Sequence, residues 1–177
     1  LIIGSGGVLS HAPRRVQSAL MMIDAFAPEG ITRLAVDSIF MMPHLGVLAS
    51  VHPKAAMQVF ERDCLIPIGT CIAPVSKKKP KKPEVCLNVK ITNAEGKTEE
   101  HEFKNNELRI LPVPEGEKVT VEAKPTKRYN LGAGPGIAVT KEVVGGVVGI
   151  IADTRGRPIE MPEDKELRIQ ALQKWYQ

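Results

Sequence analysis

Leu1-Ile2-Ile3-Gly4-Ser5-Gly6-Gly7 joins an apolar run directly to a glycine-rich turn. The apolar run predicts the end of a buried strand, and we expect a helix to follow at once, entered through Pro13. A strand, a glycine turn and a helix leave bare backbone N–H groups where a nucleotide can approach without meeting a Cβ atom. The stretch therefore predicts an α/β fold and a candidate nucleotide-binding site at Gly4, Ser5, Gly6 and Gly7.

This turn departs from both common nucleotide-binding motifs. The dinucleotide fingerprint G-x-G-x-x-G fits Gly4 and Gly6, but Leu9 occupies the position of its third glycine. The Gly-Lys-Ser/Thr triplet that ends a phosphate-binding P-loop does not occur in the sequence. A tight turn that packs a helix onto a sheet, with no ligand, therefore stays open as the alternative.

The charge of the chain is concentrated in one segment. Of 24 basic residues, five lie in the run Lys77-Lys78-Lys79-Pro80-Lys81-Lys82, which leaves 19 basic residues against 20 acidic ones. A balanced remainder argues against a broad nucleic-acid-binding face. We interpret the run as an extended linker, because like charges repel, with a phosphate- or acid-binding patch as the alternative.

The three cysteines, Cys64, Cys71 and Cys86, contain no C-x-x-C pair. They suggest neither a zinc site nor a disulfide framework, and we interpret them as buried, reduced thiols of a cytoplasmic protein. The longest apolar run, Val143 to Ala152, is too short to cross a bilayer, so no membrane partner is expected.

The lysine run divides two patterns. Before it, strands alternate with helices, which predicts a layered sheet with helices packed on it. The expected elements are a helix over 13–27, a strand over 31–36, helices over 43–49 and 53–62, and a strand over 65–72. Pro67 and Gly69 interrupt this last strand, so we expect it to be an edge or bent strand.

After the run, short strands predict a small antiparallel barrel or sandwich. They are expected over 85–91, 97–104, 107–111, 119–123, 137–144 and 147–152. A last helix is expected from Pro162, with Leu167, Ala171 and Trp175 on one face. The predicted division is an α/β part (1–75), a linker (76–84), an antiparallel β domain (85–161) and a C-terminal helix (162–177).

Four further places hold candidate binding residues, each with a structural alternative. Asp37 ends a strand, where it suits a polar site or, in preference, a cap or turn for the next segment. His11 follows the glycine turn and could contact a ligand, although hydrogen bonding to a loop is the favoured interpretation. The last two candidates are glycine- and arginine-rich loops near the C-terminal end of the chain.

Gly132, Gly134 and Gly136 could form an anion-binding nest, but Pro135 removes one N–H group, which favours a barrel-corner loop. Arg155 and Arg157 could clamp a carboxylate or phosphate, or could equally pair with Glu160 or Glu163 at the surface. No spacing supports a catalytic residue or a metal site.

Several longer stretches resemble a known family. Leu1–Leu9 is similar to the adenosine motif of the actin, sugar kinase and Hsp70 superfamily of ATPases. The stretches Asp24–Gly30, Leu34–Ser38, Leu45–Ala49 and Val147–Pro158 resemble, within that superfamily, the glutamate mutase accessory family, GlmL or "MutL", which is unrelated to the mismatch-repair protein of that name. Residues 76–127 carry little of the resemblance.

The resemblance implies an ATP-dependent accessory or reactivating factor, chaperone-like, for an adenosylcobalamin-dependent mutase. Gly4, Ser5, Gly6 and Gly7 would hold the adenosine of ATP or ADP through backbone contacts, with Mg. The family's phosphate and catalytic motifs lie earlier in the chain. Because the sequence starts inside a strand and without Met, we expect it to be the C-terminal part of a larger protein that does not hydrolyse ATP alone.

Two other functions are considered beside this one. The first is a protein–protein interaction module whose glycine turn is purely structural. The second is nucleic-acid binding through the lysine run, which ranks last because the remaining charge is balanced and aromatic residues make up only 4% of the chain.

Overall fold

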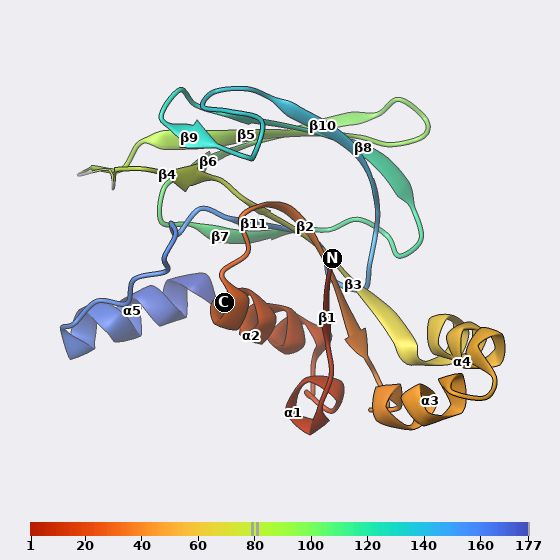
Figure 1. The fold of residues 1–177 in the computed structure, drawn as a ribbon. Helices are drawn as coiled ribbons and strands as arrows, with labels where there is room; N and C mark the ends of the chain where they lie inside the picture. The colour runs from red at the N-terminus through yellow and green to blue at the C-terminus, as the bar shows by residue number, and fades with distance from the viewer. Residues whose placement is uncertain (79, 81, 177) are drawn as a thin grey trace.

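The computed structural model describes residues 1–78, 80 and 82–176 and confirms the predicted α/β class. Two helices, a five-stranded sheet and a four-stranded sheet form three successive layers (Figure 1). Lys79 and Lys81 of the predicted linker and Gln177 of the predicted C-terminal helix lie outside the described residues.

The five-stranded sheet is the middle layer and has the order β1-β2-β3-β11-β7. Its strands are β1 (Ile2–Gly4), β2 (Gly30–Asp37), β3 (Leu65–Ala73), β11 (Gly149–Asp153) and β7 (Leu108–Leu111). β1 pairs in parallel with β2, and β11 pairs in parallel with β3. The pairs β2–β3 and β11–β7 are antiparallel, so the sheet is mixed.

The prediction that residues 65–72 form an edge or bent strand is wrong about the edge. β3 is the central strand, and it is irregular as expected: its register with β2 shifts between Leu34 and Ala35, which lie opposite Gly69 and Pro67. A bulge of this kind accommodates a proline inside a sheet because a ladder hydrogen bond is already interrupted there.

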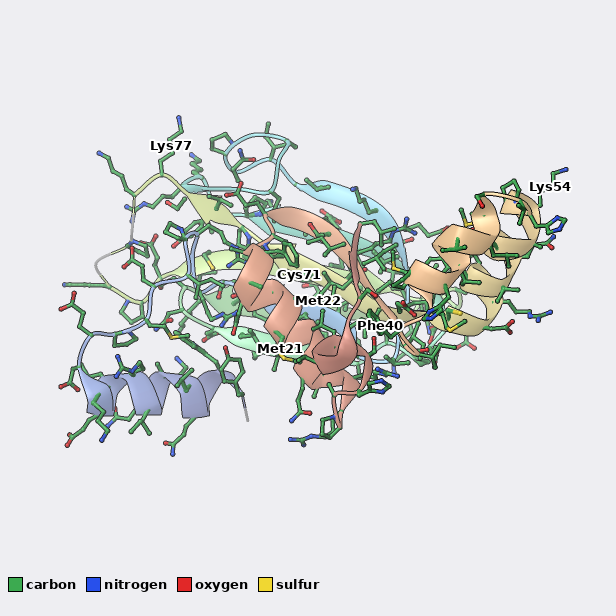
Figure 2. All side chains as sticks on the ribbon, turned by 60° about the horizontal axis from the view of Figure 1, so that its bottom comes forward. Met21, Met22, Phe40, Lys54, Cys71 and Lys77 are labelled. Atoms are coloured by element: carbon green, nitrogen blue, oxygen red, sulfur yellow. The ribbon has the colours of Figure 1, made fainter. Side chains whose placement is uncertain are left out.

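Helices α2 (Arg15–Phe26) and α5 (Lys165–Trp175) cover one face of this sheet (Figure 1). Met22 of α2 and Cys71 of β3 belong to the core between helices and sheet (Figure 2). Contrary to expectation, Pro13 precedes α2, whose N-cap is Arg14, and the helix that directly follows the glycine turn is the short α1 (Gly7–Ser10). Leu167 is also exposed, so α5 packs through its C-terminal half.

The outer layer is an antiparallel sheet of order β10-β8-β5-β6. Its strands are β10 (Val139–Val144), β8 (Lys118–Pro125), β5 (Val85–Thr92) and β6 (Thr98–Lys104), and a separate pair is formed by β4 (Val75–Ser76) and β9 (Tyr129–Asn130). Leu87, Phe103 and Val121 pack against Ile72 and Ile150 of the middle sheet. The two sheets thus form a sandwich, but it differs from the predicted antiparallel one, because its middle sheet is mixed and includes β1, β2 and β3.

The middle sheet combines strands from both sides of the lysine run. β7 and β11 come from the region expected to form a separate β domain, yet they complete the sheet begun by β1, β2 and β3. The antiparallel sheet therefore takes only part of residues 85–161, and the position of any domain boundary at 76–84 stays a prediction.

Helices α3 (Met42–Ala49) and α4 (Pro53–Val59) lie to one side, beyond the end of β2 (Figure 1). α4 continues as a π-helical turn, η1 (Phe60–Cys64), which leads into β3. The three cysteines are free and buried, as predicted. Among the described residues, no helix is long and apolar enough to cross a membrane.

Candidate functional site

The glycine turn begins with a residue that serves packing. β1 ends at Gly4, and a Cβ atom there would lie 2.8 Å from Cδ1 of Leu9 and 2.9 Å from Sδ of Met22. Glycine at this position therefore lets α1 and α2 pack closely against the end of β1.

Gly6 and Gly7 form the open part of the turn. Gly6 has a φ of +110°, which favours glycine, and its carbonyl accepts hydrogen bonds from the N–H groups of Leu9 (3.0 Å) and Ser10 (2.9 Å). A Cβ atom built on Gly6 or Gly7 would meet no atom within 4 Å. In the described part of the chain, the N–H groups of Gly7 and Val8 donate to no protein acceptor, as expected for the first turn of a helix.

Ser5 and Asp37 join the turn to the next segment of the site. The Ser5 hydroxyl donates to Oδ2 of Asp37 (3.0 Å). The same carboxylate accepts from the N–H groups of Met41 (3.0 Å) and Met42 (2.8 Å), at the start of α3. The backbone carbonyl of Asp37 accepts from the Ser10 hydroxyl. These bonds confirm the prediction that Asp37 serves as a cap or turn for the next segment. They also hold the glycine turn in place.

The Asp37 carboxyl is held in its ionised form. Burial by itself raises its pKa, but the hydrogen bonds from the Met42 and Met41 N–H groups and the Ser5 hydroxyl outweigh burial, so the pKa lies below the ordinary 3.8. A fixed negative charge therefore lies beside the turn. It repels a phosphate placed next to it and suits the uncharged, hydroxyl-bearing part of a ligand.

The other candidate next to the turn, His11, follows α1 and is exposed. Its backbone N–H donates to the Gly7 carbonyl (3.0 Å), which closes the single turn of α1. Among the described residues, its side chain has no hydrogen-bond acceptor, so the predicted loop contact of the imidazole is not formed.

Arg155 and Arg157 lie in a buried ionic network. Nε and Nη2 of Arg155 each donate to one carboxylate oxygen of Asp153 at 2.9 Å, and Nη2 also lies 2.8 Å from Oδ1 of Asp24. Nη2 of Arg157 donates to Asp153 at 3.0 Å. These arginines therefore hold carboxylates from inside the fold, rather than presenting their guanidinium groups to an external anion.

The network keeps its charges although it is buried. The side chains of Asp153 and Arg155 are both 0% exposed. Burial raises the pKa of Asp153, but the hydrogen bond from Arg155 and the charges of Arg157 and Arg155 outweigh this effect, and the pKa is lowered. The Arg155 guanidinium also lies 5.1 Å from the ring centroid of Trp175, so the network connects α2 to the end of α5.

The glycine loop at 131–136 is filled by a side chain of the protein. The N–H groups of Gly132 and Gly134 both donate to Oδ1 of Asn130, at 2.8 Å each. These two groups are therefore unavailable to an anion, which supports the loop interpretation over the nest. The missed residue was Asn130, and its place two residues before a glycine is the sequence pattern of an Asx turn.

These positions lie apart, and the structure does not gather them into one catalytic centre. Gly4–Gly7 and Asp37 form one site, whereas Arg155 and Arg157 belong to the network beside α5 and Gly132 and Gly134 to a loop on β9. Among the described residues, no group of three or more histidine, cysteine, aspartate or glutamate side chains could hold a metal ion.

Comparison with known proteins gives one match. Residues 1–64 match the family model described as "MutL protein", a span that contains β1, the glycine turn, Asp37 and the helices α1 to α4. No curated protein and no solved structure matches the chain. The segment that carries the candidate site, residues 1–64, is thus similar to the MutL family, the glutamate mutase accessory family.

Proposed function

We propose that this chain is part of an ATP-dependent accessory factor that reactivates an adenosylcobalamin-dependent mutase such as glutamate mutase. Such mutases lose activity when their cofactor loses its adenosyl group. A factor of this kind would use the binding of ATP and ADP to loosen the mutase, so that damaged cobalamin leaves. The chain would act as part of an actin-like ATPase in the cytoplasm and would contact the mutase subunits.

One observation carries this proposal: the MutL-family segment contains the open glycine turn, in which Gly6 and Gly7 present unobstructed backbone. The free N–H groups of Gly7 and Val8 can donate to ligand oxygen or nitrogen atoms. The charge of Asp37 next to Ser5 favours adenosine over phosphate at this place. Gly4, Ser5, Gly6 and Gly7 would therefore bind adenosine, while Mg and the phosphates would be held by other parts of the protein.

A second function is favoured by the contacts of Gly4 and Ser5. Gly4 faces the side chains of Leu9 and Met22, and the Ser5 hydroxyl is engaged by Asp37. These contacts explain why glycine and serine occupy the turn by packing and hydrogen bonding alone, without a ligand. The alternative is therefore a protein–protein interaction module of the same accessory family that binds the mutase without nucleotide.

Calorimetric titration of ADP-Mg into the complete protein separates the two functions. Gly7→Val places three carbon atoms in open space at a residue whose φ is not positive, so it obstructs the turn without backbone strain. We expect binding to wild type and at least about tenfold weaker binding to this variant. Gly6→Val should abolish binding as well, but it adds strain at a φ of +110°.

Gly46→Val is the matched control, since a Cβ atom there also meets no atom within 4 Å and the residue lies inside α3, outside the Gly4–Gly7 turn. It should bind ADP-Mg like wild type. If wild type does not bind, or if Gly7→Val binds as well as Gly46→Val, the adenosine site is not at this turn. Where binding is found, reactivation of an inactivated mutase by both variants is the next assay.

A further inference from the structure

A groove of about 1090 Å³ opens where the start of β2, the pair β4–β9 and the start of β10 meet. Its apolar lining comes from three segments that are distant in sequence: Ile31, Val75, and the stretch with Leu131, Pro135 and Val139. Aliphatic side chains from both sheets and from the loop after β9 therefore form one surface. This surface is separate from the nucleotide site proposed above.

The rim of the groove is strongly basic. It is lined by Lys77, Lys78, Lys82, Lys127, Arg128 and Lys141, against the two carboxylates of Glu29 and Glu84. Arg128 is neutralised by Glu84, with Nη1 3.0 Å from Oε1. The five lysines form no ion pair with any other described residue, so the groove carries a clear excess of positive charge.

The fold, rather than the lysine run alone, creates this charge. Lys77, Lys78 and Lys82 belong to the run that we interpreted as a linker, whereas Lys127 follows β8 and Lys141 lies on β10. Outside the run the chain is nearly neutral. Lysines from three segments thus surround one apolar surface. This arrangement indicates a surface complementary to negative charge, whereas a linker would leave its lysines separately in solvent.

The groove also runs beside an unpaired strand edge. β10 is the outermost strand of its sheet and pairs with β8 on one side only. Val139 and Lys141 of this strand both line the groove. An edge strand offers backbone N–H and C=O groups to an extended chain, with side-chain pockets alternating along it.

We propose that this groove binds an extended acidic segment of a protein partner, in which carboxylates alternate with aliphatic residues. The carboxylates would face the lysines, and the aliphatic side chains would cover Ile31, Val75 and Val139. A nucleic acid fits less well, because the groove-lining residues within the described chain include no aromatic side chain on which a base could stack.

The groove and the glycine turn lie at opposite ends of β2. Gly30 and Ile31 at its start line the groove, and Asp37 at its end holds Ser5. Residues 32–36 lie between Ile31 and Asp37 and separate the two places by roughly 20 Å. Figure 2 shows Lys77 correspondingly far from Phe40, which follows Asp37. Groove variants should therefore leave nucleotide binding unchanged, so failure of either proposal can be told from failure of the other.

The test measures fluorescence anisotropy of a short labelled peptide of alternating Glu and Val, at low and at physiological salt. The variant Lys127→Glu with Lys141→Glu reverses two lysines of the rim that lie outside the run at 77–82. We expect at least about tenfold weaker binding in this variant, and weaker binding of wild type as salt rises. A control variant, Lys54→Glu with Lys124→Glu, makes the same change in net charge at exposed residues that do not line the groove.

Absence of binding to wild type at low salt would overturn the proposal, and so would equal loss in the two double variants. An oligothymidylate of the same charge is titrated in parallel. If it binds more tightly than the peptide and is lost in the Lys127→Glu, Lys141→Glu variant, the groove is a nucleic-acid site and the peptide assignment is wrong. Thermal melting of each variant checks that the fold is retained.

Discussion

Arg155 connects two segments that lie far apart in the sequence, α2 and the end of α5. Its guanidinium group holds Asp153 and Asp24 and lies over the ring of Trp175. The pair with Asp153 is fully buried. A buried carboxylate that loses its partner is left as an uncompensated charge, and this loss costs more than the pair itself contributes.

Arg155→Met should therefore lower the free energy of unfolding by about 3–5 kcal/mol, although methionine preserves much of the side-chain volume. Urea denaturation followed by circular dichroism measures the change. Arg62→Met is the matched control, because Arg62 forms its bidentate pair with Asp63 at the surface. A measurable loss in the control, or none in Arg155→Met, would contradict the assigned role of the buried network.

The partners of a single side chain such as Arg155 can be predicted from the sequence only when they are local. Two arginines around a glycine predict either a clamp for an anion or surface pairs with Glu160 or Glu163, and a clamp is present. Its anions, however, are Asp153, two residues away, and Asp24, which is separated from Arg155 by 131 residues. Asp37 was predicted to cap the next segment because that contact is local, but its bond to Ser5 depends on the pairing of β1 with β2.

Among the secondary-structure elements, β3 makes a very close backbone contact with β11. A Cβ atom on Gly69 would lie 2.0 Å from the carbonyl oxygen of Gly149 in β11, and Gly69 has a φ of +154°. Backbone atoms cannot move away as a flexible side chain can. The parallel pairing of β3 with β11 therefore requires glycine at this position.

Gly69→Ala should destabilise the protein by about 3 kcal/mol or more, because it combines steric overlap with strain. Gly96→Ala provides the comparison: Gly96 also has a positive φ, +81°, but a Cβ atom there meets nothing within 4 Å. Only the strain of about 1 kcal/mol should remain in that variant. Equal melting temperatures for the two variants would show that β3 and β11 can separate without cost.

Most elements could be predicted from local patterns, and the exceptions have a common cause. The strand at 31–36 and the helix at 43–49 were predicted correctly, because their apolar spacing and proline positions act locally. Pro67 and Gly69 predict an edge or bent strand, and the bulge beside Leu34 accommodates them in a central one. Such a bulge is set by the partner strand and cannot be seen in the segment itself.

For the whole molecule, the decisive feature is that the middle sheet takes strands from both halves of the sequence. Three residues of β11 are each 0% exposed: Ile150, Ile151 and Ala152. Ile150 and Ala152 pack toward the outer sheet, and Ile151 packs toward the helices. Without β11, the edge of β3 on that side would be open to water. Composition and the lysine run suggested two separate units because neither reports which strands pair.

A polypeptide of residues 1–84 should therefore not fold alone. We expect poorly dispersed amide signals in its NMR spectrum, and we expect addition of the polypeptide 85–177 to restore dispersion at sufficient concentration. Well-dispersed signals from 1–84 alone would instead support the predicted domain boundary at 76–84. The intact chain provides the reference spectrum for both outcomes.

The position of β11 between β3 and β7 also governs the order of events on the ribosome. β3 leaves the exit tunnel early, with β2 on one side and nothing on the other. Its second neighbour is made only after the whole outer sheet has been translated. During that interval an apolar strand edge stays open to any other nascent chain. The lysines at 77–82, which emerge directly behind it, would then repel a second copy of the same intermediate.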